Sequence, residues 1–149
     1  MIPFNRPLII GNEISLIKDC ISRGWISGRG HYTKEVEALL KCQLNCTGNI
    51  LLTTSCTHSL ELSAILLNLM PGDEVIVPSF TFVSSALAFY MHGANIVFSD
   101  IRKDTLNIDE SNLENLITCR TKAIVVVHYA GVACEMDSIS KISEKYGLT

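Results

Sequence analysis

The sequence predicts an α/β protein with a mostly parallel sheet and helices on both of its faces. From residue 50 onward, strand-like segments alternate with helix-like segments along the 149-residue chain. The strand-like segments are also apolar almost throughout, which is typical of parallel strands that are covered on both faces. We therefore expect a helical N-terminal arm with a glycine-containing loop over residues 1–49 and an α/β domain over residues 50–149.

The N-terminal arm is expected to contain two helices. Isoleucines recur at helical spacing in NEISLIKDCISRG, where Asn12 is a plausible N-cap and Gly24 a plausible end. The glycine-rich sequence GWISGRGHYT follows and favours a loop. Thr33 can cap the second helix.

The α/β domain is expected to alternate between the two kinds of element. The expected strands are 49–54, 74–79, 95–100 and 123–131, and the expected helices are 58–69, 81–93, 109–117 and 135–148. The helix at 58–69 is apolar on nearly all sides, which predicts that it is buried. Asp109 is the expected cap of the helix that it begins.

Composition narrows the class of protein. The net charge is only −3 and the basic residues are scattered, so no surface for nucleic acid is expected. The six cysteines form no C-x-x-C pair, which favours reduced, mostly buried thiols and no metal site. The N-terminal MIPFNRPLII lacks the continuous apolar stretch of a signal peptide, and no later run reaches membrane-spanning length. We expect a cytoplasmic protein that binds no membrane.

Short polar side chains gather in TTSCTHS, between the first expected strand and its helix. Hydroxyl groups at a helix start satisfy unpaired backbone amides, so plain capping is one interpretation. The other is a phosphate cradle, in which Ser55, Cys56 and Thr57 offer amides and hydroxyls to an anion. The glycines and lysine of a Walker loop are missing, and the stretch alone leaves both interpretations open.

Other junctions between elements offer further candidates. Phe82 follows the strand at 74–79 and is either a core residue or a ring that stacks on a flat heterocycle. His128 is either a general base or a hydrogen-bonded histidine in a turn, and the turn is favoured because no catalytic partner is visible. The acidic residues within 100–110 lack the pattern of a calcium loop, so a solvated turn and a helix cap are favoured.

Taken together, the junction sequences resemble those of the DegT/StrS-type sugar-nucleotide aminotransferases. The resemblance is carried by MIPFN at 1–5, LLTTSCTHSLE at 51–61, PGDEVIVPSFTFVSSALAF at 71–89, GANIVFSDIRKDTLNIDE at 93–110 and VHYAGVACEMD at 127–137. It implies the N-terminal part of the fold-type I aminotransferase large domain, with pyridoxal 5'-phosphate as cofactor. It also implies a homodimer that shares its active sites across the interface.

The resemblance also implies roles for individual residues. Cys56 and Thr57, next to Ser55, would hold the cofactor phosphate through backbone amides and the Thr57 hydroxyl. Phe82 would stack on the pyridine ring, and Trp25 and Ser27 would border the entry of the sugar nucleotide. The implied reaction moves an amino group from glutamate to the 4-keto carbon of a dTDP-linked 6-deoxyhexose. Its implied setting is the biosynthesis of cell-surface polysaccharide, such as enterobacterial common antigen or lipopolysaccharide.

In the family, an aspartate that pairs with the pyridinium nitrogen and a lysine that holds the cofactor covalently both follow the region matched here. Because residues 1–149 include neither, we expect no transamination by this chain alone and assign it no catalytic residue. The alternative is a non-catalytic remnant or assembly module. A small Rossmann-like nucleotide binder ranks last, because no G-x-G-x-x-G is present.

Overall fold

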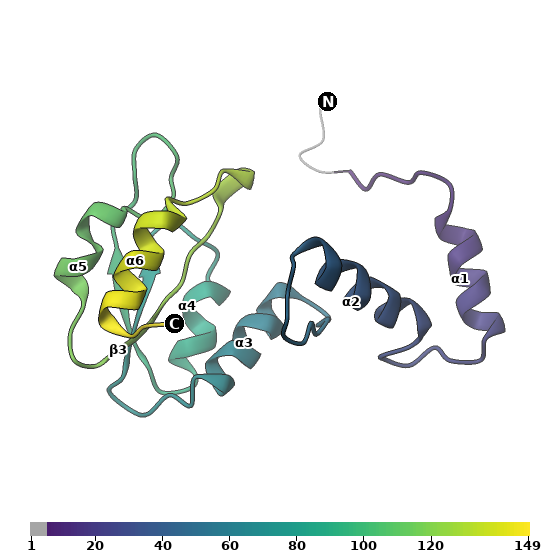
Figure 1. Cartoon of the computed structure of the whole chain (residues 1–149), viewed down its shortest axis with the longest axis horizontal. Coiled ribbons are helices and arrows are strands. Elements are labelled where there is room, and N and C mark those ends of the chain that lie inside the picture. The colour runs from purple at the N-terminus through teal and green to yellow at the C-terminus, as the bar shows by residue number, and fades with distance from the viewer. Residues whose placement is uncertain (1–5) are drawn as a thin grey trace. The chain divides into compact units, whose positions relative to one another are not determined.

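The computed structural model describes residues 6–149, so the sequence block at 1–5 lies outside the described residues. The chain divides into two compact units, Met1–Leu52 and Thr53–Thr149 (Figure 1). Within residues 6–149, none of the helices combines the length and the hydropathy that a membrane crossing requires.

The first unit contains helices α1 (Glu13–Ser22) and α2 (His31–Gln43), and neither helix has a buried residue. Asn12 stands at the N-cap of α1, but its side chain makes no capping hydrogen bond. The Glu13 carboxylate accepts the amides of Ile10 and Gly11 instead, at 2.8 and 2.9 Å. The start of α1 is thus stabilised by a carboxylate that the sequence prediction did not single out.

Helix α2 begins earlier than predicted. Gly30 is its N-cap, with the extended backbone that this position requires, and Thr33 therefore lies inside the helix. The prediction that Thr33 caps this helix is wrong. At this earlier start, a ring nitrogen of His31 lies 2.9 Å from the carboxylate of Glu35, one helical turn away.

The second unit is built on a three-stranded parallel sheet with the order β2-β1-β3. The strands are β1 (Glu74–Pro78), β2 (Asn95–Ser99) and β3 (Thr121–Ile124). The central strand β1 is buried at every position, as expected for a parallel strand that is covered on both faces. The predicted fold class is confirmed.

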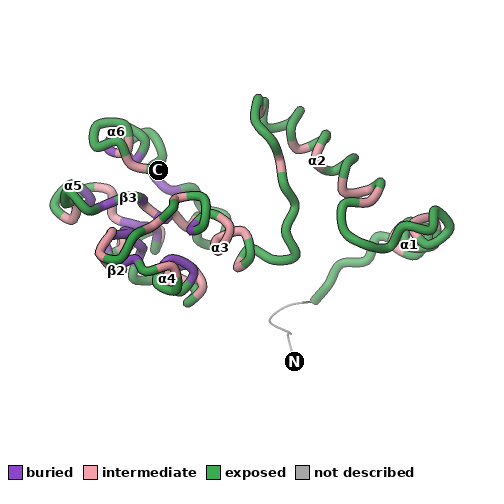
Figure 2. The backbone as a smooth tube through the Cα atoms, turned by 90° about the horizontal axis from the view of Figure 1, so that it is seen from below, coloured by how far each residue is buried: buried purple, intermediate pink, exposed green. Residues whose placement is uncertain are grey.

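Helices cover both faces of this sheet, and Figure 2 shows the buried residues gathered around it. Helices α3 (Cys56–Leu66) and α4 (Ser84–Tyr90) cover one face, where Val75 and Val77 contribute to the core. Helices α5 (Leu113–Leu116) and α6 (Met136–Tyr146) cover the other face, where Ile76 is buried. Because successive side chains of a strand point to opposite faces, β1 supplies both cores.

Two strand predictions need correction. Residues 49–54 form no strand, because a strand needs a neighbour to complete its backbone hydrogen bonds, and no described strand pairs with this segment. The strand predicted at 123–131 begins at Thr121 and ends at Ile124. Beyond it, Val125 still donates to the Ile76 carbonyl at 2.8 Å, after which the chain turns.

Burial also differs from the prediction. In α3 only Ala64 is buried, and Leu66 is 75% exposed. The predicted burial of this helix is wrong. All six cysteines are free, but only Cys134 is buried, so the expectation of mostly buried thiols is also wrong.

The ends of the remaining helices agree better with the sequence. Asp109 precedes the short 3₁₀ helix Glu110–Asn112, and its carboxylate accepts the Ser111 amide at 3.0 Å, which confirms the predicted cap. Gly147 ends α6 in the left-handed conformation, with φ of 64°. After it, Thr149 donates to the Lys122 carbonyl and accepts from the Ile124 amide, the bonding pattern of a parallel ladder along the outer edge of β3.

Candidate functional site

A pocket of about 430 Å³ opens in the second unit, just past the carboxyl ends of β1 and β3. Its walls come from the start of α3, the connection between β1 and α4, and the segment that follows β3. In open parallel sheets, ligands bind at this edge, because the helix N-termini point toward it. Cys56, Thr57 and Phe82, which the sequence predicts as cofactor ligands, all line this pocket.

Two pocket-lining residues at the start of α3 have unpaired backbone amides. The Ser55 hydroxyl accepts the His58 amide at 3.2 Å and so acts as the helix cap. The amides of Cys56 and Thr57 have no acceptor within residues 6–149. With the positive end of the helix dipole behind them, these amides fit an anionic group such as a phosphate. The capping interpretation is thus confirmed for Ser55, and the phosphate cradle stays a prediction for Cys56 and Thr57.

Phe82 lies in the turn before α4, and its side chain is 74% exposed. This exposure excludes the core interpretation of Phe82. The Ser85 amide donates to the Phe82 carbonyl at 3.0 Å, and the hydroxyls of Thr81 and Ser85 are 2.8 Å apart, so the turn is held from both sides. An exposed ring in the wall of a pocket, carried by such a turn, is available to stack on a flat ligand.

Tyr129 is a pocket residue that the sequence interpretation missed. It follows β3 in the 3₁₀ turn Tyr129–Gly131 and lines the pocket. Its ring packs on Phe80, with 4.8 Å between the ring centroids. The position of Tyr129 just past an apolar strand is the signal in the sequence that indicates it.

The ring of His128 makes a hydrogen bond to the segment that follows its own turn. Its Nδ1 accepts the Cys134 amide at 3.0 Å, which supports the interpretation of a hydrogen-bonded turn residue. Cys134 in turn donates its thiol hydrogen to the Val127 carbonyl at 3.3 Å. Burial raises the pKa of the Cys134 thiol, so this cysteine is protonated near neutral pH and is a poor nucleophile.

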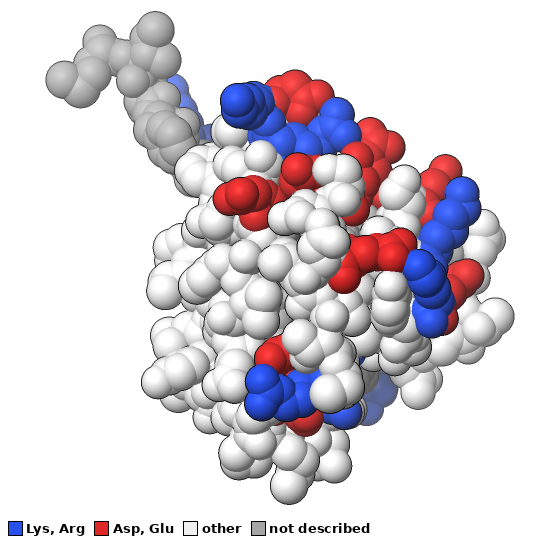
Figure 3. Space-filling model, turned by 90° about the vertical axis from the view of Figure 1, so that its left-hand side faces the viewer, with Lys and Arg blue, Asp and Glu red and all other residues white. Residues whose placement is uncertain are grey.

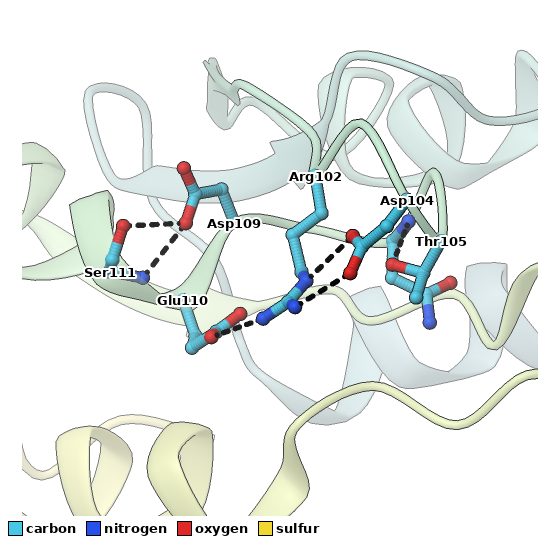
Figure 4. A network of polar contacts seen from close by, with 7 residues as sticks. Arg102, Asp104, Thr105, Asp109, Glu110 and Ser111 are labelled. Carbon is cyan, nitrogen blue, oxygen red and sulfur yellow. Dashed lines mark hydrogen bonds and ion pairs between the residues drawn. The ribbon is translucent and has the colours of Figure 1, made fainter.

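Two acidic side chains of the segment after β2 form ion pairs with one arginine (Figure 4). Arg102 pairs with Asp104 at 2.9 Å and with Glu110 at 2.8 Å. The hydrogen bonds from Arg102 lower the pKa of Asp104 to about 2, and the two carboxylates raise the pKa of Arg102. Together with the Asp109 cap, these pairs support the predicted solvated turn. Within residues 6–149, no group of three or more side chains is arranged to hold a metal ion.

The charged side chains form no continuous basic surface on the face drawn in Figure 3, where lysines and arginines alternate with acidic residues.

Trp25 and Ser27 belong to the first unit. The Trp25 indole donates to the Gly28 carbonyl at 3.2 Å, which stabilises the loop. A Cβ atom at residue 30 would lie 3.1 Å from the indole, a tight contact that would require a small shift of the ring. The substrate role of Trp25 and Ser27 stays a prediction.

Comparison with known proteins identifies the family. The model of the DegT/DnrJ/EryC1/StrS aminotransferase family matches residues 7–149. The chain belongs to this family. The predicted resemblance and the predicted class of enzyme are thereby confirmed at the level of the family, whose members depend on pyridoxal phosphate.

Solved structures of similar proteins agree with this assignment. Spr1654 from Streptococcus pneumoniae, a candidate sugar aminotransferase solved in PLP, PMP and apo forms, is 39% identical with a TM-score of 0.88. The match covers 97% of this chain and 36% of Spr1654. The 3-amino-5-hydroxybenzoic acid synthase is 34% identical with a TM-score of 0.87, over 95% of this chain and 37% of the synthase.

The GDP-4-keto-6-deoxy-D-mannose-3-dehydratase of E. coli, solved with bound hydrated PLP, is similar at 25% identity and a TM-score of 0.87. Here the match covers 98% of this chain and 39% of the dehydratase. The chain thus spans little more than a third of the length of these relatives. The predicted fold, the N-terminal part of a fold-type I large domain, is confirmed.

Proposed function

We propose that this chain is the cofactor-phosphate-binding part of a pyridoxal phosphate-dependent aminotransferase. The enzyme would transfer an amino group from glutamate to the 4-keto carbon of a dTDP-linked 6-deoxyhexose. The observation that carries this proposal is a pair of unpaired amides at Cys56 and Thr57, two residues that line one pocket together with the exposed Phe82.

In this proposal the start of α3 binds the cofactor phosphate. The amides of Cys56 and Thr57 donate to phosphate oxygens, and the Thr57 hydroxyl adds a third donor. A phosphate dianion is further stabilised by the positive end of the helix dipole. Because the Cys56 contact uses the backbone, the thiol is not needed for it.

The remaining walls would hold the ring of the cofactor. Phe82 stacks on one face, while Leu60 and Val125–Val127 line an apolar wall that excludes water. The cofactor itself supplies an electron sink for reactions at the amino-bearing carbon. The aspartate and lysine that the family implies would fall in the two-thirds of the relatives' length that this chain does not cover.

The substrate class is supported by the relatives rather than by the pocket. One relative is described as a sugar aminotransferase, and another acts on a 4-keto-6-deoxy sugar carried by a nucleotide. We assign to the complete protein the activity of a dTDP-4-amino-4,6-dideoxygalactose transaminase of enterobacterial common antigen or lipopolysaccharide biosynthesis. It would be a cytoplasmic homodimer in which Trp25 and Ser27 border the substrate entry.

A titration of the chain with pyridoxal phosphate, followed by the absorbance of the cofactor, tests the pocket. We expect saturable binding, and at least a tenfold weaker affinity when Thr57→Ala and Phe82→Ala are combined, because a charge-assisted hydrogen bond and a stacking contact are lost. Phe98→Ala is the matched control, since it removes a ring that is also exposed, at 58%, but lies outside the pocket. Binding that survives the double substitution would refute the proposed site.

The activity is tested in a longer protein that includes the downstream region. Incubated with glutamate and dTDP-4-keto-6-deoxyglucose, it should release an amino sugar nucleotide that mass spectrometry detects. If this protein binds pyridoxal phosphate at Thr57 but transfers no amino group to any nucleotide sugar, the non-catalytic alternative replaces the transaminase proposal.

A further inference from the structure

A buried asparagine connects two loops at the edge of the sheet that carries the pocket. Asn107 is 2% exposed and lies in the loop between β2 and the 3₁₀ helix Glu110–Asn112. An antiparallel bridge between Ile101 and Ile108 closes this loop, and the Arg102 amide donates to the Asn107 carbonyl at 2.8 Å. The backbone of Asn107 is therefore held by contacts within its own loop.

The side chain of Asn107 holds the turn that follows β3 at both of its ends. Its Oδ1 accepts the Tyr129 amide at 2.9 Å, and its Nδ2 donates to the Val132 carbonyl at 3.0 Å. These partners are 22 and 25 residues away along the chain. An amide side chain offers an acceptor and a donor together, which neither a carboxylate nor an aliphatic side chain of this size does.

The turn that Asn107 holds has an unfavourable backbone. Ala130 has φ of 51° and Gly131 has φ of 82°, both in the left-handed region that a residue other than glycine rarely occupies. Such a conformation persists only where the surroundings impose it. Tyr129, the first residue of the turn, is a wall of the pocket.

We propose that Asn107 is a positioning residue for the cofactor pocket. By fixing the turn, it holds Tyr129 where the ring of pyridoxal phosphate binds, while the phosphate contacts at the start of α3 do not depend on it. This inference rests on the proposed function, because it assumes that the pocket takes pyridoxal phosphate.

The substitution Asn107→Asp keeps the acceptor for Tyr129 and removes the donor to Val132, and Asn107→Leu removes both. In a titration of the full chain, we expect Asn107→Asp to weaken the binding of pyridoxal phosphate about tenfold, the effect of losing one buried hydrogen bond. Inorganic phosphate, measured by competition, should bind with unchanged affinity, because it needs only the amides of α3. Asn115→Asp is the matched control, since Asn115 is exposed and bonds only to Asn112, at 2.9 Å.

A measurement on the unsubstituted chain covers the case in which the variants do not fold. In a ¹⁵N–¹H spectrum, the Asn107 side-chain amide and the Tyr129 backbone amide should shift on addition of pyridoxal phosphate but not of inorganic phosphate. The inference is overturned if these signals stay fixed while those of Cys56 and Thr57 move. It is also overturned if Asn107→Asp binds pyridoxal phosphate as the unsubstituted chain does. A chain that binds neither ligand contradicts the proposed function itself.

Discussion

At the scale of single residues, the start of α3 contains both a helix cap and the two amides that we propose as phosphate ligands. Ser55 uses its hydroxyl to cap the helix, whereas the two amides that follow it remain unpaired. A helix start always leaves such amides, so the sequence TTSCTHS alone did not distinguish a cap from a cradle. In the structure, Cys56 and Thr57 line the pocket and Ser55 does not, which supports the proposed phosphate cradle.

The capping role of Ser55 is testable through stability. We expect Ser55→Ala to lower the free energy of unfolding by about 1 kcal/mol, because the His58 amide loses its acceptor. Urea denaturation measures this change. Ser63→Ala is the control, since Ser63 is in mid-helix and its hydroxyl donates to the Ser59 carbonyl, which α3 already uses. Equal losses in the two variants would contradict the capping role.

The pairing of Asp104 with Arg102 predicts a dependence of stability on pH. The pKa of Asp104 falls from 3.8 to about 2 in the folded chain, so its contribution is complete above pH 3.8 and is lost as the pH falls toward 2. We expect Asp104→Asn to lose less thermal stability than the unsubstituted chain over this pH range.

The melting temperature, followed by circular dichroism in steps of pH, measures this difference. The control is Asp137→Asn on α6, where the carboxylate makes no ion pair within the described part of the chain. The prediction fails if the Asp104 variant and the unsubstituted chain lose the same stability between pH 3.8 and about 2.

The sequence can reveal a site residue when the pattern that indicates it lies next to that residue along the chain. Cys56, Thr57 and Phe82 each stand at a junction after an apolar segment, so the resemblance and the pattern both point to them. Asn107 carries no such signal, because its partners are more than 20 residues away and appear only when the sheet brings two loops together. Its proposed role rests on its burial and on the geometry of its hydrogen bonds.

At the scale of elements, the sequence predicts best the strands whose apolar runs end at turns on both sides. β1 and β2 lie almost where the pattern places them, because their apolar runs are bounded by turns. The segments 49–54 and 125–128 have equally apolar sequences but form no strand. Hydropathy reports the tendency of a segment to be buried, whereas a strand also needs a neighbour for its backbone.

The C-terminal cap of α6 provides a test at this scale. Gly147 has φ of 64°, and a side chain placed there would meet nothing within 4 Å. The cost of Gly147→Ala is therefore purely conformational, and we expect a loss of about 1 kcal/mol in the free energy of unfolding. Gly147→Asn should lose less, because asparagine tolerates this conformation. An alanine variant as stable as the original in urea would contradict the assigned cap.

At the scale of the whole molecule, exposed apolar side chains are the main departure from an ordinary globular domain. Ile14, Ile17 and Ile21 share one side of α1 and are 63%, 54% and 61% exposed. A continuous apolar stripe of this kind marks an interaction surface. It supports the proposed homodimer, in which such a stripe would meet protein rather than water.

Sedimentation velocity over a range of concentrations tests this association. We expect the chain to form dimers or larger assemblies, and the combined substitution Ile17→Lys and Ile21→Lys to shift it toward the monomer. Lys18→Ala serves as the control, because it alters the same helix without touching the stripe. A chain that is monomeric at every concentration would contradict the proposed interface.

The central claim is that the opening amides of α3 hold the phosphate of the cofactor. A crystal structure of the chain with pyridoxal phosphate tests this claim most directly. The account predicts phosphate oxygens about 3 Å from the amide nitrogens of Cys56 and Thr57, with the pyridine ring against Phe82. A phosphate bound elsewhere, with those amides turned to other acceptors, would contradict it.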